Sequence, residues 1–429
     1  MQFTKIALAV ASFVAVGSAV AAPNANRIAI SAGASAVQGN LTLAVQQLCT
    51  NAGGVQTTFG SGNFTTVVCA NTAVTGGAGG TYASKPNADF INFAGTNYAE
   101  FRLNVSNGSF GNIQVLNGFP FTYRDPITGT NIARPAGSVI VGGFNDVNPD
   151  TFPSGTIGSN TVFESFPAGV AQMFGVGASV ALYEKMFNAQ KAAGLLPPTC
   201  QVTDTAIAYC VPSIGKPQMS TIMSDNEFNS AYLKGLEFLT GDAADNAVEL
   251  RYVRRVDTSG TQASAQNFFL GLTCSRANLP VVPEPIEDDE VGGLKDKLRN
   301  SIRVYAAGGT SDVRNELNKP GVFALGVLSG ENNQTGQSWR WLRISNSSIG
   351  ENAVPGSAGI TNSNTMQAGT YDFYFELTYS GGNAANNAFL ATVANSLNTL
   401  PAPVGLVNNT VLTSGYNKGG NTCLPSSSL

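Results

Sequence analysis

The sequence contains no histidine among its 429 residues, and this absence excludes several kinds of chemistry. A Ser-His-Asp triad, a Cys-His pair, a His-ligated zinc ion and a haem on a proximal His are all impossible. Charge is scarce as well, because Asp, Glu, Lys and Arg make up 12% of the chain, against about 25% in an average soluble protein. With 23 Lys and Arg against 27 Asp and Glu, no nucleic-acid partner is expected.

The N-terminal segment 1–21 is predicted to be a signal peptide. Lys5 precedes an apolar run that extends from Ile6 to Val16, and small residues follow. The run is too short to span a bilayer, which needs about 20 apolar residues. Cleavage is therefore expected after Ala21, with no membrane insertion of the mature chain. The predicted location is periplasmic or secreted.

Six cysteines form an even set, which an oxidising compartment would pair as disulfides. Six cysteines allow fifteen connectivities, and the sequence alone does not choose among them. Short loops favour Cys49–Cys69 and Cys200–Cys210, which leaves Cys274–Cys423 by elimination. No CxxC spacing is present, so neither a metal nor a redox cofactor is expected.

One pattern recurs four times: a β-branched strand, a small hydroxyl-rich loop and then a helix. Strands alternating with helices predict an α/β fold with a mostly parallel sheet. Three further strands are predicted outside these four units, and the second of them leads directly into a predicted helix. The four units start at the strands 27–30, 100–105, 248–256 and 301–305; the further strands are 138–141, 172–177 and 371–377, and the further helices 178–196 and 387–397.

The loops of these units are candidate anion-binding elements. In open α/β sheets, ligands bind beyond the carboxyl ends of the strands. A helix start there offers free N–H groups and a partial positive charge. A single such loop is usually only an N-cap, but four together favour a site. The third loop also carries a full charge on Arg255; Arg254 is expected on the opposite strand face, solvated or salt-bridged.

The segment RRVDTSGTQASAQNFFLGLTC (254–274) resembles the anion-binding segment of the phosphate-binding proteins of bacterial ABC importers. Those proteins carry Arg, three intervening residues and then Ser-Gly-Thr at a helix start, and Arg255 and Ser259 have this spacing. Further segments resemble the family in sequence order. They are SAGASA (31–36), SNGS (106–109), GGFNDVNPDTF (142–152), QMFGVGAS (172–179) and GVFALGVLS (321–329).

The resemblance implies a type II periplasmic-binding-protein fold, in which two crossing strands join two α/β lobes around a ligand cleft. Lobe 1 would comprise 22–168 and 335–429, and lobe 2 would comprise 169–334. Arg and the Ser-Gly-Thr group would hold phosphate oxygens, the early loops would donate hydrogen bonds, and an Asp would accept the phosphate proton. Carried over by position, the binding residues are Ala34, Ser35, Ser109, Asp146, Arg255, Ser259, Gly260 and Thr261.

The chain departs from the family in three respects. The family's Ser-Asp pair is Asn145-Asp146 here, and the second loop is Asn-Gly-Ser (107–109) rather than a Gly pair. The chain is also longer, with insertions near 75–88, 199–211 and 281–300. The leading hypothesis is a non-enzymatic solute-binding protein for phosphate or a similar oxyanion, serving an ABC importer or a sensor. The alternatives are a cell-surface or structural protein that retains the fold, or a phosphatase-like hydrolase built on it. The absence of histidine argues against the hydrolase.

Overall fold

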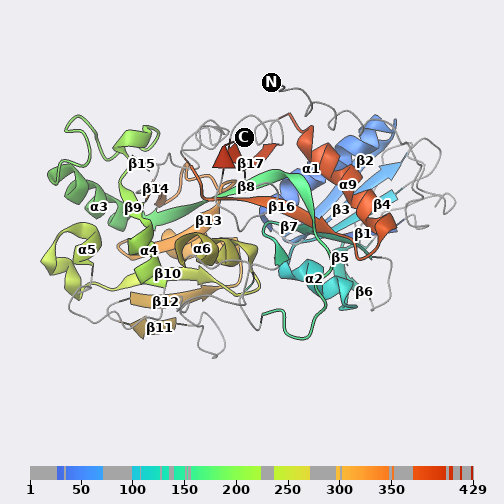
Figure 1. Cartoon of the computed structure of the whole chain (residues 1–429), viewed down its shortest axis with the longest axis horizontal. Coiled ribbons are helices and arrows are strands. Elements are labelled where there is room, and N and C mark those ends of the chain that lie inside the picture. The colour runs from blue at the N-terminus through green and yellow to red at the C-terminus, as the bar shows by residue number, and fades with distance from the viewer. Residues whose placement is uncertain are drawn as a thin grey trace, which may run out of the picture.

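The computed structural model (Figure 1) describes most of the mature chain. The predicted signal peptide (1–21), Ala34, Cys274, Cys423 and the insertion near 75–88 lie outside the described residues. These are 27–32, 35–70, 99–106, 108–125, 128–134, 140–149, 152, 156–223, 236–270, 296–299, 302–346, 350–351, 371–401, 405–408, 416–417 and 427–428.

The α/β class is confirmed, and the strands form two parallel groups. In the first strand group, β1 (Arg27–Ala32) lies between β4 (Ala99–Asn104) and β7 (Ile140–Asn145). The second strand group places β10 (Leu250–Arg255) between β12 (Ile302–Ala307) and β13 (Phe323–Ser329). Each group therefore gathers the carboxyl ends of its three strands at one edge.

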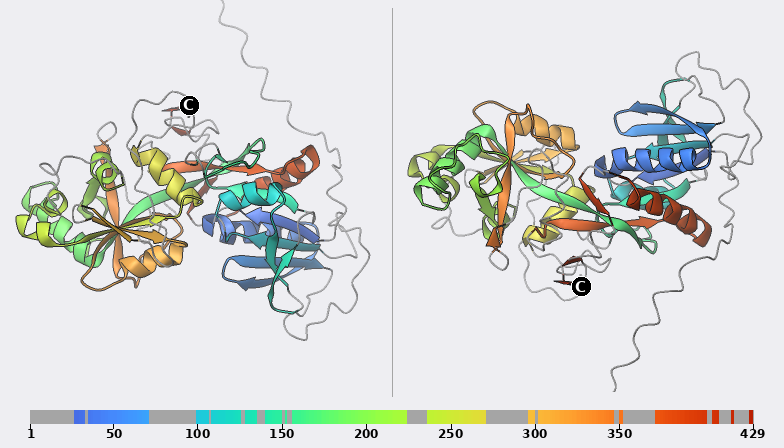
Figure 2. Two further views of the ribbon diagram at one scale, coloured as in Figure 1. Left: turned by 90° about the horizontal axis from the view of Figure 1, so that it is seen from below. Right: turned by 90° about the horizontal axis from the view of Figure 1, so that it is seen from above.

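Two strands link the groups, and Figure 2 shows them running from one body of the molecule to the other. The 14-residue strand β8 (Phe166–Ser179) pairs with β16 (Tyr374–Ser380) along its first half and with β13 along its second. β16 continues the sheet by pairing with β7. The sheet path is thus continuous through both groups, in the order β11-β12-β10-β13-β8-β16-β7-β1-β4-β3-β2.

The expectation of a mostly parallel sheet is wrong outside the two groups. A tight turn joins β2 (Val55–Ser61) to β3 (Phe64–Ala70), and β3 pairs antiparallel with β4. β11 (Asp296–Arg299) likewise pairs antiparallel with β12. The connections between β2 and β3 and between β11 and β12 are too short for the crossover that parallel pairing needs, so these neighbours are antiparallel. The sheet is therefore mixed.

All four strand–loop–helix units are present in the structure. Their helices are α1 (Gln38–Asn51), α2 (Phe110–Leu116), α6 (Gly260–Leu270) and α7 (Thr310–Leu317). The two further predicted helices appear as α3 (Val180–Ala192) and α9 (Ala384–Asn398). In Figure 1, α1 and α9 lie side by side on one face of the first strand group, and α2 lies on the other face.

Two hydrophobic cores are present, and the one under the second strand group also takes in Phe110 and Ile113 of α2. Leu41 of α1, Phe101 of β4 and Leu390 of α9 belong to the first. The second core extends to β14 (Trp339–Asn346), which pairs with β8 and whose two tryptophans are buried. Residues 339–346, placed in lobe 1 by the sequence interpretation, thus pack with the second strand group. The remaining elements are η1 (Ser35–Val37), β5 (Phe121–Arg124), β6 (Asn131–Arg134), η3 (Ala208–Cys210), β9 (Ser213–Gly215), α4 (Lys216–Met223), α5 (Glu237–Thr240), η4 (Ala243–Ala247), β15 (Gly350–Glu351), β17 (Leu406–Asn408), β18 (Tyr416–Asn417) and β19 (Ser427–Ser428).

Two of the expected disulfides are confirmed. Cys49 at the end of α1 is bonded to Cys69 of β3, and Cys200 is bonded to Cys210.

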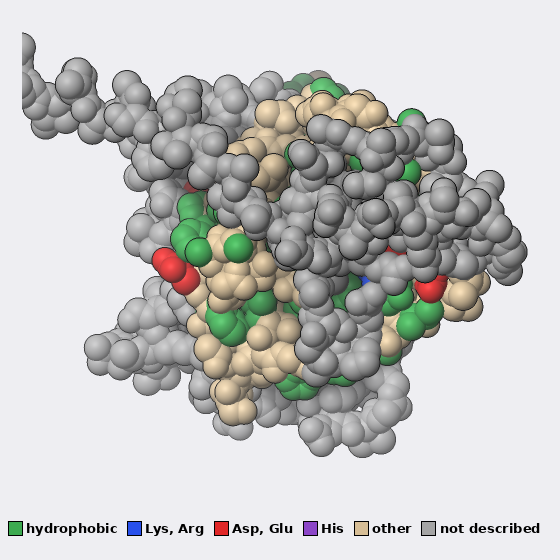
Figure 3. All heavy atoms as spheres, turned by 90° about the vertical axis from the view of Figure 1, so that its right-hand side faces the viewer, with side chains coloured by type: hydrophobic (Ala, Val, Ile, Leu, Met, Phe, Trp, Pro, Cys, Tyr) green, Lys and Arg blue, Asp and Glu red, His purple; other side chains and the backbone are tan. Residues whose placement is uncertain are grey.

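Among the described residues, no helix is both long and apolar enough to cross a membrane. The face beside β2 to β4, drawn in Figure 3, shows few charged side chains among its coloured atoms.

Candidate anion site

Three of the predicted site segments lie at one edge of the first strand group. β4 and β7 both run parallel to β1, so the loops that follow these strands meet beyond the same edge. Ser35 opens the helical turn η1 after β1 and is half-buried. Ser109 follows β4 directly before α2, and Asp146 follows β7. This edge supplies hydroxyl groups and one carboxylate.

Ser109 and Asp146 are in direct contact. The Ser109 hydroxyl donates a hydrogen bond to Asp146 Oδ1, and the Asp146 backbone N–H donates to Ser109 Oγ at 3.0 Å. Both side chains are buried, with exposed fractions of 0% and 2%. Each residue therefore fixes the other at the edge.

The second strand group contributes the start of α6. Ser259 is the N-cap, because its carbonyl accepts from Ala263 N at 3.0 Å and its hydroxyl accepts from Gln262 N at 3.4 Å. Gly260 and Thr261 then form the first turn of the helix, and all three predicted residues are buried. The N-terminal N–H groups of an 11-residue helix favour an anion at this point.

The carboxyl-terminal edge of the first strand group and the start of α6 in the second meet at Gly260. A Cβ atom on this residue would lie 1.6 Å from Asp146 Oδ1 and 2.7 Å from Ser109 Oγ. Beside it, Phe110 N, at the start of α2, donates to Thr258 O at 3.4 Å. Only glycine allows the helix start to approach the carboxylate so closely. The structure thus brings Ser109, Asp146 and Gly260 together from segments far apart in the sequence.

Arg255 ends β10 and is 7% exposed. Its Nη1 donates to Thr310 Oγ1 at 3.0 Å and its Nη2 to Gly308 O at 3.4 Å, while its buried Nε has no hydrogen-bond partner in the described part of the chain. Burial lowers the pKa of Arg255, and the negative charges of Asp146, Asp312 and Glu331 act in the opposite direction. A fixed guanidinium with a spare donor suits an oxyanion.

Burial raises the pKa of Asp146 to about 6. The hydrogen bond from Ser109, its own backbone N–H and the charge of Arg255 each oppose this rise. The carboxyl group can therefore exist in either protonation state near neutral pH. In its charged form it accepts a hydrogen bond, and in its neutral form it can also donate one.

Sequence reasoning missed Glu331, which follows β13. This half-buried carboxylate accepts from Ser329 Oγ at 2.6 Å and from Asn332 Nδ2 at 3.1 Å. Burial raises its pKa to about 7, and the negative charge of Asp146 adds to the rise. No motif marks this residue. Its connection to the site comes only from the fold, since β13 is a neighbour of β10.

Gly308 and Thr310 were also missed as partners of Arg255, although a signal existed. They belong to the fourth strand–loop–helix unit, whose strand β12 pairs with β10, so that Ala307 lies opposite Arg255. Neighbouring strands of a parallel sheet place their following loops together. The pairing of β12 with β10 thus explains why the loop after β12 holds the Arg255 guanidinium.

Arg254 is ion-paired, as one of the two expectations had it. Its guanidinium contacts the carboxylate of Asp257, whose side chain is 47% exposed. Arg254 itself is only 2% exposed, so it is not solvated. β10 is a central strand with neighbours on both sides, and both of its faces are covered. Two consecutive arginines can therefore both be buried.

The site is built from hydrogen-bond donors, one arginine and two carboxylates. Within the described ranges, no cluster of three or more Cys, Asp or Glu side chains could hold a metal ion. No family model, no curated protein and no solved structure matches the chain.

Proposed function

We propose that the chain is a solute-binding protein for phosphate or a similar oxyanion, with the two-lobed type II binding-protein fold. The observation that carries the proposal is the meeting of Ser109 and Asp146 with the α6 start at Gly260. Neither strand group alone offers a complete site. Hydrogen-bond donors come from both groups, whereas Arg255, whose charge acts on Asp146, comes from the second.

The two linking strands support the two-lobed part of the proposal. β8 and β13 pair antiparallel where the strand groups join, and β16 returns to the first group. Motion about these strands would open and close the contact between Asp146 and Gly260. The lobe limits then shift from the sequence interpretation, because β14 belongs with the second core. Secretion is supported by the leader pattern and the two disulfides.

Asp146 would give the site a preference for protonated oxyanions. An ionised carboxylate accepts a hydrogen bond from a ligand P–OH group, but it repels an anion that brings no proton. Hydrogen phosphate carries such a proton at neutral pH, and sulfate does not. Arg255 and the α6 N–H groups would hold the remaining oxygens.

Calorimetric titration of the mature protein with phosphate and sulfate at pH 7.5 tests this proposal. Phosphate is expected to bind one to one, and sulfate about tenfold or more weakly, which corresponds to one charge-assisted hydrogen bond. Asp146→Asn should reduce the preference, because an amide can donate to an unprotonated oxygen. Absence of binding by any oxyanion would favour a structural protein that retains the fold.

A further inference from the structure

Two cavities lie beside the first turn of α3. Figure 1 shows α3 at the outer end of the second strand group. A cavity of about 290 Å³ lies on one side and another of about 360 Å³ adjoins it. Val180, Glu184 and Arg340 line both. No residue of the candidate anion site lines either cavity, so they form a separate feature, here called the α3 groove.

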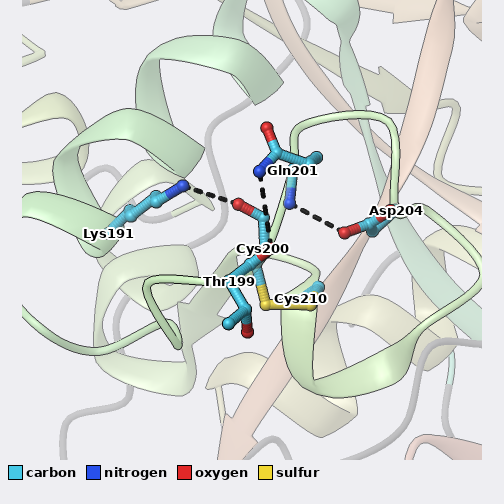
Figure 4. Close-up of a disulfide and its surroundings, with 6 residues drawn as sticks. All are labelled: Lys191, Thr199, Cys200, Gln201, Asp204 and Cys210. Carbon is cyan, nitrogen blue, oxygen red and sulfur yellow. Dashed lines mark hydrogen bonds between the residues drawn. A yellow bond between two sulfur atoms is a disulfide. The ribbon is translucent and has the colours of Figure 1, made fainter.

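A disulfide-bridged loop forms one wall of the α3 groove. Val202, Thr203 and Thr205 line the smaller cavity, and the Cys200–Cys210 bond closes the loop that carries them. Figure 4 shows how the loop is held: Lys191 Nζ of α3 donates to Cys200 O at 2.6 Å, and Gln201 N donates to Asp204 at 2.7 Å. This is the insertion near 199–211, which the proposed function leaves without a role.

The start of α3 lacks its usual cap. The hydroxyl of Ser179, the N-cap residue, donates to Val322 O at 2.5 Å and accepts from Ala324 N at 3.0 Å. It makes no hydrogen bond to the first turn of the helix. The N–H of Val180 donates to Ser338 O at 3.0 Å, and Val180 and Ala181 of that turn line the groove, so the positive end of a 13-residue helix faces it.

Two charged side chains of the groove have no ionic partner among the described residues. Nη1 of Arg340 donates to the carbonyls of Gln337 and Trp339, at 2.6 and 2.8 Å, and the guanidinium makes no ion pair there. Glu184 is exposed and makes none either. Although both residues line both cavities, they are not paired with each other. Lys319, which lines the larger cavity, is paired with Glu316, so Arg340 and Glu184 are the unpaired positive and negative groups of the groove within the described chain.

Tyr183 adds an unsatisfied donor to the same wall. The residue lines the smaller cavity and is 2% exposed, yet its hydroxyl has no hydrogen-bond partner within the described chain. Burial raises the pKa of the phenol, and the charge of Arg340 opposes the rise, which fits an uncharged hydroxyl close to the guanidinium. Buried polar groups are normally hydrogen-bonded, so a missing partner points to a ligand.

We propose that the α3 groove binds a small zwitterion of the amino-acid type. Its carboxylate would lie toward Arg340, the Tyr183 hydroxyl and the start of α3, and its ammonium group toward Glu184. The hydroxyls of Thr203 and Thr205 supply further polar contacts at the loop wall. The volume of the smaller cavity suits a molecule of this size. This proposal does not depend on the oxyanion function.

The test is calorimetric titration of the mature protein with the common amino acids, and with acetate and ethylamine as separate halves of the zwitterion. At least one amino acid should bind one to one, more tightly than either half. Tyr183→Phe removes only the unpartnered hydroxyl, and Glu184→Gln changes only an exposed carboxylate. Each should weaken that binding about tenfold, as expected for loss of a hydrogen bond to a charged group.

Matched controls separate this site from the anion site. Arg255→Ala should leave amino-acid binding within about twofold, and Tyr183→Phe should leave phosphate binding unchanged, since the sites share no residue. Failure of every amino acid to bind would overturn the proposal. So would binding that is indifferent to both groove variants, or acetate binding as tightly as the amino acid.

Discussion

The two strand groups contribute opposite chemistry to the point where they meet. The first brings a seven-residue helix α2, the hydroxyl of Ser109 and the carboxylate of Asp146. The second brings the 11-residue helix α6 and the guanidinium of Arg255. In the proposed function, an anion would therefore gain most of its binding free energy from the second group, while Asp146 of the first group would favour an anion that carries a proton. Affinity would then come mainly from one edge and selectivity from the other.

The largest expected effect is on affinity, from Arg255→Ala. The substitution removes the positive charge that β10 supplies to Asp146, and a charge-assisted hydrogen bond contributes about 1.5–3 kcal/mol. Phosphate affinity should therefore fall about ten- to a hundredfold, as measured by calorimetry. Circular dichroism provides the folding control.

Arg254→Ala is the matched variant on the same strand. It should lower the melting temperature, because Arg254 is buried and paired with Asp257, but it should change phosphate affinity less than about threefold. A larger loss of affinity in Arg254→Ala than in Arg255→Ala would reverse the assignment of the two arginines.

Next in size is the pH dependence of stability that Asp146 contributes. Its pKa is about 6 in the folded chain against 3.8 for an ordinary carboxyl, so the folded state binds more protons across this window. The free energy of unfolding should therefore fall as pH rises from about 4 to about 6, by about 2–3 kcal/mol from this group.

Asp146→Asn removes that contribution, and urea unfolding in phosphate-free buffer at several pH values measures it. Glu331→Gln is the matched variant, whose effect should extend to about pH 7 because its carboxyl has the higher pKa. Identical pH profiles for wild type and Asp146→Asn would show that burial does not shift this carboxyl.

A smaller effect is expected from Gly260→Ala, which separates the two edges. The new Cβ would lie 1.6 Å from Asp146 Oδ1, so the carboxylate or the helix start must move. Phosphate affinity should fall about tenfold, since a displacement of about 1 Å is costly at a fixed site. Gly39→Ala in α1, where nothing lies within 4 Å of the added atom, is the control and should not weaken binding. Equal affinities for both variants would mean that the edges need not touch.

The smallest effect distinguishes the two disulfides. Cys49–Cys69 spans 20 residues in the first body and Cys200–Cys210 spans 10 in the second. Loop-closure entropy predicts that removing the longer bridge with paired Cys→Ser changes destabilises by about 0.6 kcal/mol more than removing the shorter one. Urea denaturation of the two double variants gives the difference. A larger loss from the shorter bridge would indicate that it also holds the wall of the α3 groove in place.

Local patterns predicted much of this fold. The four strand–loop–helix units and the second half of β8 follow from β-branched runs, small loops and helix-forming segments, which are short-range signals; the extension of β8 back to Phe166 was not predicted. The two short disulfides follow from loop length. The antiparallel pairing of β3 with β4 could not be placed in the same way, because a long connection separates the two strands and a local pattern does not select a strand's partner.

The site shows the same division. The residues that stand beside recognisable loops, such as Ser109 and Ser259, could be named from the sequence. Glu331 could not, because it is placed by the pairing of β13 with β10 rather than by a motif. The burial of Arg254 was missed for a related reason: strand alternation predicts opposite faces but not whether each face is covered.

The most direct measurement is a crystal structure of the mature protein grown with arsenate, an oxyanion of phosphate shape whose arsenic scatters anomalously. The account predicts one strong anomalous peak between the first turn of α6 and Ser109, with arsenate oxygens within hydrogen-bonding distance of the Arg255 guanidinium. Crystals that bind no arsenate at this point, or that hold it only elsewhere, would contradict the claim that the two strand groups share one anion.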